Sequence, residues 1–123
     1  MLEEMKLKDV IELVNLLQNK KDESIKIENG RYVIVRTYSA GVFAGNLHSR
    51  VNGSVILHNA RRLWEWSGAA SLSQLAMEGV KNPDGCKFPC EITTGIELTQ
   101  PIEIINCTLE AEKSIKTVKI WEA

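Results

Sequence analysis

Arginine and aromatic residues are concentrated in one short region of this sequence. Arginine side chains bind phosphates through paired hydrogen bonds and also stack on rings. Aromatic side chains offer flat faces to nucleobases, and the small residues at 39–41 would let a ligand approach backbone N–H groups. The combination predicts binding of a ligand that is both anionic and planar. The cluster consists of Arg36, Tyr38, Phe43, Arg61, Arg62, Trp64 and Trp66.

The same residues also have purely structural interpretations. Tryptophans on a strand most often belong to the core or to a subunit interface. Arg61 and Arg62 could form internal ion pairs with Glu65 or with other glutamates. The sequence leaves these interpretations open beside ligand binding.

Cysteines and histidines raise the question of a metal site. Cys86 and Cys90 have a C-x3-C spacing, which differs from the C-x2-C pairs of zinc knuckles, and no second knuckle follows. His48 and His58 stand on either side of a predicted hairpin turn. With Cys107 the number of cysteines is odd, which disfavours a disulfide framework. We therefore expect reduced thiols, no metal and no cofactor.

The sequence contains no motif that is typical of a catalytic site. Ser39 lies in Tyr38-Ser39-Ala40-Gly41, which is not a G-x-S-x-G nucleophile elbow. The sequence has no phosphate-binding P-loop and no dinucleotide fingerprint. We expect a binding protein without catalytic residues. A nucleotide-processing enzyme stays open as an alternative, because active sites assemble from distant residues.

Composition fits one soluble domain. The chain has 123 residues, of which 44% are hydrophobic, with 15 basic and 16 acidic side chains. This balance disfavours binding to long nucleic acid, which needs a basic stripe. The amino terminus has acids where a secretory signal has bases, and no apolar run is long enough for a membrane span. We expect a cytoplasmic protein that binds neither membrane nor long nucleic acid.

Residues 1–29 predict an amphipathic helix followed by a polar linker. One apolar stripe recurs with helical spacing, and it would pack either on the same domain or on a partner subunit. Asn29-Gly30 ends the linker. Residues 30–123 then form a single α+β ligand-binding domain. The stripe consists of Leu7, Val10, Ile11, Val14 and Leu17.

Strand-like runs at 32–38, 42–50 and 55–66 predict an antiparallel meander. Asn52-Gly53 predicts a type I′ hairpin, in which both central residues need positive φ. Strand alternation places Arg61 and Arg62 on opposite faces unless a bulge intervenes.

The remaining elements are two short helices and further strands. Ser71 and Gln74 fit a capping box for a helix that Gly79 would end, and Thr108 could cap a second helix over 109–115. Residues 96–105 and 117–121 predict strands. The fold class is thus α+β, an antiparallel β-meander with an N-terminal amphipathic helix and two short helices packed on the sheet.

Four sequence patterns carry a resemblance to known proteins. They are Val35-Arg36-Thr37-Tyr38-Ser39-Ala40-Gly41-Val42-Phe43, Asn59-Ala60-Arg61-Arg62-Leu63-Trp64-Glu65-Trp66, Ala70-Ser71-Leu72-Ser73-Gln74-Leu75-Ala76 and Cys86-Lys87-Phe88. With them, residues 31–121 resemble a family of small phage and prophage proteins. The overall organisation of the sequence is also similar to that of the first type of Thoeris anti-defence protein.

The resemblance implies a function, partners and a location. It implies a sponge in the host cytoplasm that sequesters glycocyclic ADP-ribose signals from TIR enzymes, or cyclic di- and trinucleotides, without cleaving them. It further implies a homodimer, with a hexamer assembled from such dimers as the larger alternative. Another class of function is a phage protein–protein interaction module or minor structural protein.

Candidate ligand-binding residues follow from the cluster and the resemblance together. Phosphate contacts are assigned to Arg36, Arg61 and Arg62, and stacking to Tyr38, Trp64 and Phe88. Polar and backbone contacts are assigned to Asn59 and to the turn with Ser39 and Gly41. We expect the site at a seam between subunits.

Overall fold

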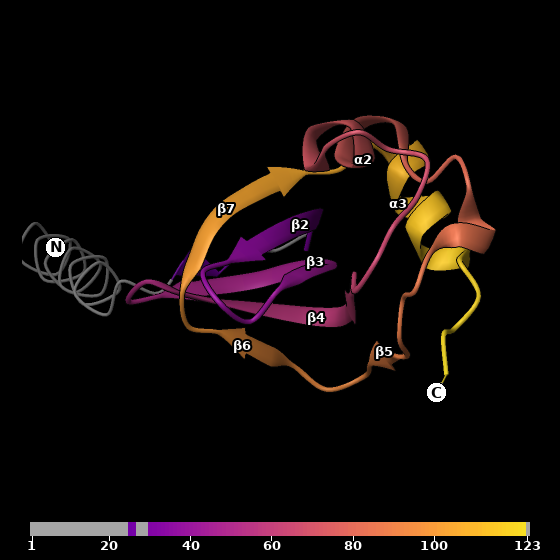
Figure 1. The fold of residues 1–123 in the computed structure, drawn as a ribbon. Helices are drawn as coiled ribbons and strands as arrows, with labels where there is room; N and C mark the ends of the chain where they lie inside the picture. The colour runs from indigo at the N-terminus through magenta and orange to yellow at the C-terminus, as the bar shows by residue number, and fades with distance from the viewer. Residues whose placement is uncertain (1–24, 27–29, 123) are drawn as a thin grey trace, which may run out of the picture.

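The computed structural model describes residues 25–26 and 30–122. The predicted N-terminal amphipathic helix lies outside the described residues. The elements, drawn in Figure 1, are β1 (Ile25–Lys26), β2 (Tyr32–Thr37), β3 (Val42–Val51), β4 (Ser54–Arg62), α2 (Leu72–Glu78), the 3-10 helix η1 (Pro83–Gly85), β5 (Glu91–Ile92), β6 (Ile96–Leu98), β7 (Pro101–Asn106) and α3 (Leu109–Thr117).

Strands β2, β3 and β4 form the predicted antiparallel meander. The turn between β3 and β4 has Asn52 at φ 47° and Gly53 at φ 81°. Both angles are positive, as a type I′ turn requires. The predicted hairpin is therefore confirmed.

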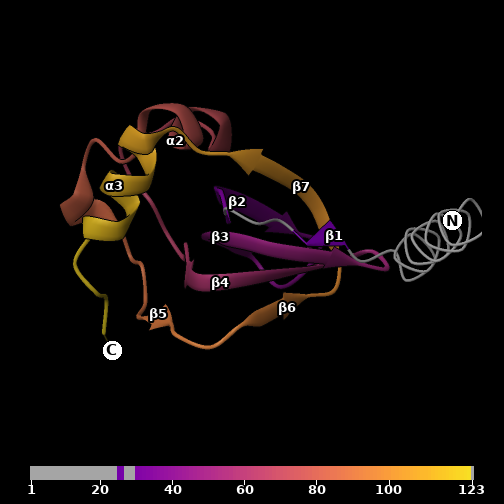
Figure 2. The ribbon, with the colours of Figure 1, turned by 180° about the vertical axis from the view of Figure 1, so that it is seen from behind.

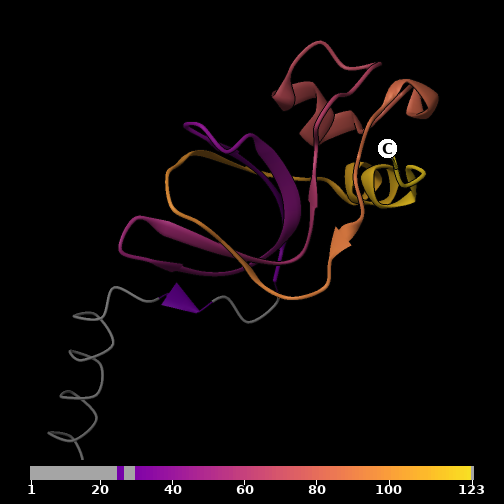
Figure 3. The ribbon, with the colours of Figure 1, turned by 60° about the horizontal axis from the view of Figure 1, so that its bottom comes forward.

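The sheet curls because its last strands return to opposite sides of the meander. β7 pairs with β2 and β6 pairs with β4, although only Thr99 and Gln100 separate β6 from β7. Two register shifts in the β3–β4 pairing, between Ala44 and Asn46 and between Leu47 and Ser49, increase the bend. Figure 3 shows the resulting curl. Strand β1 pairs with the end of β3, so part of the expected linker is a strand.

Two hydrophobic cores lie on the two faces of the sheet. Along β2, Val33 and Val35 point into the curl, whereas Tyr32 and Ile34 point to the outer face. The core inside the curl contains Val33, Val35, Phe43, Leu47, Val55, Leu57, Ala60 and Leu98. The outer core includes Ile34, Leu63, Leu75, Phe88 and Ile115, and α2 and α3 cover it at the end of the sheet away from β1 (Figure 2).

Both short helices begin at the predicted caps. Ser71 Oγ accepts a hydrogen bond from Gln74 N at 3.2 Å, and Gln74 Oε1 accepts one from Ala70 N at 2.8 Å. Thr108 Oγ1 accepts from Ala111 N at 3.1 Å. The hydroxyls of Ser71 and Thr108 thereby satisfy N–H groups that the first helical turn leaves free. No helix in the described ranges is long and apolar enough to cross a membrane.

One predicted strand is shorter than expected, and another is absent. The run 55–66 leaves the regular ladder after Arg62 and keeps only a single bridge between Glu65 and Lys87. The predicted strand 117–121 is wrong, because α3 continues to Thr117 and Val118 then packs into the outer core. Ile120 makes one parallel bridge with Phe88. The α+β class, the antiparallel sheet and the two helices are confirmed.

Candidate functional site

The end of β4 sends its two arginines to opposite sides, as predicted. Arg62 pairs across the ladder with Phe43, and its guanidinium lies 4.4 Å from the centre of that ring. Arg61 reaches the other way, and its guanidinium lies 5.5 Å from the centre of the Phe88 ring. The two arginines therefore belong to two different surfaces.

Arg62 lines a small surface groove of about 200 Å³. We call it the tryptophan groove, and it is formed by Ala40, Gly41, Val42, Arg62, Leu63, Trp64 and Trp66. Pairing beyond β4 shapes its floor, since Leu63 N donates to Val42 O at 2.8 Å and Trp64 N donates to Lys87 O at 3.2 Å. The groove thus joins the β2–β3 turn to the segment that follows β4.

The β2–β3 turn is closed by Gly41. Its carbonyl accepts hydrogen bonds from Thr37 N at 3.0 Å and Thr37 Oγ1 at 2.8 Å. Gly41 has φ 103°, a backbone conformation that side chains disfavour. This conformation directs the carbonyl of Ala40 toward Arg62, whose Nη1 donates to it at 2.6 Å.

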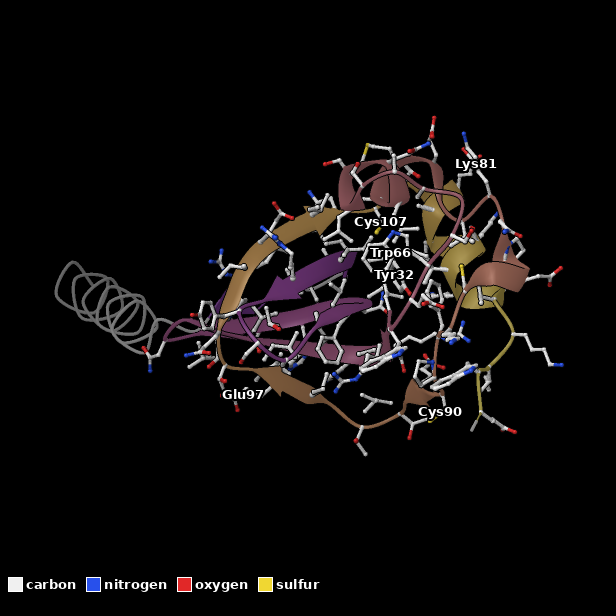
Figure 4. All side chains as sticks on the ribbon, viewed as in Figure 1. Tyr32, Trp66, Lys81, Cys90, Glu97 and Cys107 are labelled. Atoms are coloured by element: carbon white, nitrogen blue, oxygen red, sulfur yellow. The ribbon has the colours of Figure 1, made fainter. Side chains whose placement is uncertain are left out.

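The groove combines a fixed cation with an exposed ring. The Phe43 ring and the Ala40 carbonyl hold the Arg62 guanidinium, and no carboxylate among the described residues lies within ion-pair distance of it. Nε and Nη2 therefore keep free N–H donors. Trp64 is 65% exposed, whereas Trp66 packs partly against the outer core. Figure 4 shows Trp66 between the sheet and the helices.

Arg61 lines a second hollow of about 280 Å³ on the other side of β4. We call it the arginine cleft, and it is formed by Tyr32, Asn59, Arg61, Glu91, Lys116, Val118 and Ile120. Asn59 has φ 53° at an irregular point of β4. The cleft thus lies between the edge of the sheet, α3 and the segment that follows α3.

Arg61 is a buried connector between distant parts of the chain. Nε donates to Pro89 O at 3.0 Å, Nη1 to Ile115 O at 2.8 Å and Nη2 to Phe88 O at 3.0 Å. Only 5% of the residue is exposed, and burial lowers the pKa of its guanidinium from the ordinary value. Ile115 belongs to α3, so Arg61 ties the sheet to the last helix.

The structure brings together only some of the predicted site residues. Gly41, Arg62 and Trp64 meet in the tryptophan groove, while Asn59 and Arg61 line the arginine cleft. Tyr32, Glu91 and Lys116 were not predicted. They come from β2, β5 and α3, and only long-range contacts place them beside Arg61, so no local sequence signal marks them.

The other predicted residues lie outside both hollows. Tyr38 is 77% exposed and Ser39 is exposed, both in the turn before Gly41. Arg36 forms an ion pair with Glu103, with 3.6 Å between Nε and Oε1. Phe88 is fully buried in the outer core, so its ring has no open face for a ligand, and we leave it out of the site.

The cysteines and histidines of the described residues form no cluster of three or more metal ligands. Cys86 is buried, with Sγ 3.5 Å from Ser67 N, and all three thiols are free. Burial, together with Glu112, raises the pKa of the Cys107 thiol to about 12. His48 and His58 stack with 4.1 Å between ring centres.

Comparison with known proteins places the chain in one family. Residues 30–115 match the family described as a domain of unknown function (DUF6948), which covers both hollows except for Lys116, Val118 and Ile120. The chain therefore belongs to this family. Neither the search of curated proteins nor the search of solved structures found a match.

Proposed function

We propose that this protein binds a small cyclic nucleotide in the tryptophan groove and holds it without cleaving it. The ligand is a TIR-derived signal of the glycocyclic ADP-ribose type, with cyclic di- and trinucleotides as related candidates. In the host cytoplasm of an infected bacterium the protein acts as a phage anti-defence sponge. It is not an enzyme and uses no cofactor.

The single observation that carries this proposal is the fixed guanidinium of Arg62 beside the exposed indole of Trp64. The free N–H donors on Nε and Nη2 suit two oxygens of a phosphate. The indole offers a face to adenine, and stacking of one base contributes about 1–3 kcal/mol. The Gly41 turn lets the ligand approach backbone groups closely.

The size of the groove supports a second copy of the chain as part of the site. Pockets that enclose drug-sized ligands measure about 300–1,000 Å³, whereas the tryptophan groove measures about 200 Å³. One copy would thus hold only part of a cyclic nucleotide. We propose a homodimer whose second copy supplies the opposite wall at the exposed side chains of Tyr38 and Trp64. A hexamer would be an assembly of such dimers.

Isothermal titration of the full chain with glycocyclic ADP-ribose tests the proposal. We expect saturable binding by the native protein and roughly 10- to 100-fold weaker binding by Arg62→Ala, because a hydrogen-bonded charge contact contributes about 1.5–3 kcal/mol. Trp64→Ala should weaken binding to a similar extent.

Arg50→Ala is the matched control, since Arg50 is exposed at the far end of β3 and does not line the groove. It should bind as the native protein does. Equal affinities for Arg62→Ala and Arg50→Ala would contradict the proposed site. Chromatography of the ligand after denaturation separates a sponge, which returns it intact, from a nucleotide-processing enzyme.

The exposed aromatic side chains favour a second candidate function, a protein–protein interaction module or minor structural protein of a phage. Tyr38 is 77% and Trp64 is 65% exposed, and such rings commonly anchor protein interfaces. In this case Arg62→Ala would leave function intact, whereas deletion of residues 1–29 would abolish it. The same two variants, assayed for ligand binding, separate the candidates.

A further inference from the structure

The arginine cleft lies on the other side of β4 from the tryptophan groove and takes no part in the proposed function. Four of its seven lining residues carry hydrogen-bond donors: the guanidinium of Arg61, the ammonium of Lys116, the hydroxyl of Tyr32 and the amide of Asn59. Glu91 is its one acidic residue and is exposed.

Arg61 places a positive charge in the cleft without a direct counter-ion. The residue is 5% exposed, and no carboxylate in the described part of the chain lies within 4.0 Å of its nitrogens. Three backbone carbonyls accept its hydrogen bonds, which leaves further N–H donors on Nη1 and Nη2. A buried charge is costly unless it is paired, so an anion in the cleft would stabilise this arrangement.

Tyr32 adds an unused donor at the same place. The residue is 4% exposed, and its hydroxyl has no hydrogen-bond partner within the described residues. Every fully enclosed side-chain nitrogen or oxygen there does have a partner. The Tyr32 hydroxyl must therefore open onto free space, and the cleft is the space that Tyr32 lines. Burial raises the pKa of Tyr32 above its ordinary value, so the phenol keeps its proton and can donate.

The other charged groups lie nearer to solvent. Lys116 Nζ lies 5.1 Å from the centre of the Tyr32 ring and 2.9 Å from Glu112 Oε2. Glu91 and Lys116 are exposed and Glu112 is half-buried. Water screens charges at such positions more strongly than it screens the buried guanidinium. Among the residues that line the cleft, Arg61 therefore carries the only buried charge.

We propose that the arginine cleft binds a small oxyanion, the phosphate or carboxylate group of a ligand, between the guanidinium of Arg61 and the hydroxyl of Tyr32. Lys116 and Asn59 add donors at the entrance. Val118 is buried and Ile120 is half-exposed, and together they form an apolar wall for the rest of the ligand. This is a second site, and its ligand need not be planar or cyclic.

NMR titration of the full chain tests the proposal through the Nε–H signal of Arg61. The probes are inorganic phosphate and sodium acetate, each compared with sodium chloride at equal ionic strength. We expect a saturable shift with phosphate or acetate and none with chloride. Tighter binding of phosphate than of acetate would identify the ligand's group as a phosphate, and the opposite order would identify it as a carboxylate.

Conservative variants keep the test independent of folding, because Arg61 itself connects too many segments to be replaced safely. Tyr32→Phe removes only the hydroxyl and should lower the affinity for the anion about tenfold. Lys116→Gln should lower this affinity by a smaller factor. Lys113 is exposed on the same helix but does not line the cleft, so Lys113→Gln should leave the affinity unchanged. Trp64→Ala should also leave it unchanged, which separates this site from the tryptophan groove.

Shifts that grow linearly and match those in chloride would overturn the proposal. Equal anion affinity in the native protein and in Tyr32→Phe would overturn it as well.

Discussion

Arg61 and Arg62 are neighbours in sequence but have different tasks. Arg61 is buried, and its three hydrogen bonds go to carbonyls of Phe88, Pro89 and Ile115. Arg62 is held by one carbonyl and one ring beside a surface groove. Alternation along β4 separates the two side chains. Substitution of Arg61 should therefore lower stability as well as anion binding in the arginine cleft, and substitution of Arg62 should weaken binding in the tryptophan groove.

We predict that Arg61→Lys lowers the free energy of unfolding by about 2–4 kcal/mol. A lysine ammonium cannot reproduce the planar fork, so buried carbonyls lose their donors. Urea denaturation followed by tryptophan fluorescence measures the change. Arg50→Lys is the matched control and should stay within about 0.5 kcal/mol of the native protein, since Arg50 is exposed. Equal stability of the two variants would contradict the structural role of Arg61.

The packing of α2 against α3 depends on a close approach at Gly79. This glycine ends α2 with φ 79°, and a Cβ built there would lie 2.7 Å from Cβ of Ser114 in α3. Ser114 Oγ also accepts a hydrogen bond from Val80 N at 2.7 Å. The end of one helix is thus fitted to the face of the other.

We predict that Gly79→Ala destabilises the fold more than Gly53→Ala does. The two glycines have nearly equal φ, 79° and 81°, but a Cβ at Gly53 meets nothing within 4 Å. Gly53→Ala should therefore cost only the backbone strain, about 1–2 kcal/mol. Gly79→Ala should cost about 1–3 kcal/mol more, because of the clash and because ψ of −162° at Gly79 gives a backbone conformation nearly restricted to glycine. Urea denaturation of both variants gives the difference, and equal losses would show that the close approach is unimportant.

Local patterns predicted the elements better than their assembly. Alternation and Asn52-Gly53 predict the meander, and Ser71 and Thr108 predict the helix starts. The curl was not predicted, because it depends on β6 and β7 pairing with strands far away in sequence. The error at 117–121 has a similar origin, since Val118 packs into the outer core directly after α3 and Ile120 makes only one bridge, with Phe88.

Only part of the candidate site could likewise be predicted from the sequence. Arg62, Trp64 and Gly41 could be found because they lie near each other in strand pairs that local patterns define. Composition alone could not tell a buried ring from an exposed one, so Phe88 was assigned to stacking although it lies in the core. Tyr32 and Lys116 could not be predicted as site residues, because only the packing of α3 against the sheet brings them together.

In the molecule as a whole, the tryptophan groove and the arginine cleft lie on opposite sides of one strand of the curled sheet. The end of β4 contributes Arg62 to the tryptophan groove and Arg61 to the arginine cleft. Two cores, one inside the curl and one under the helices, hold this strand in place. A small domain can thereby present an arginine in each of two hollows without opening either core.

We propose that the protein captures a cyclic nucleotide signal and leaves it whole. The most direct measurement is mass spectrometry of small molecules released by denaturation from protein co-expressed with a TIR enzyme that makes glycocyclic ADP-ribose. We predict that the native protein and Arg50→Ala release the intact cyclic ligand and that Arg62→Ala releases little of it. Protein that carries no cyclic nucleotide, or only a linear product, would contradict the account.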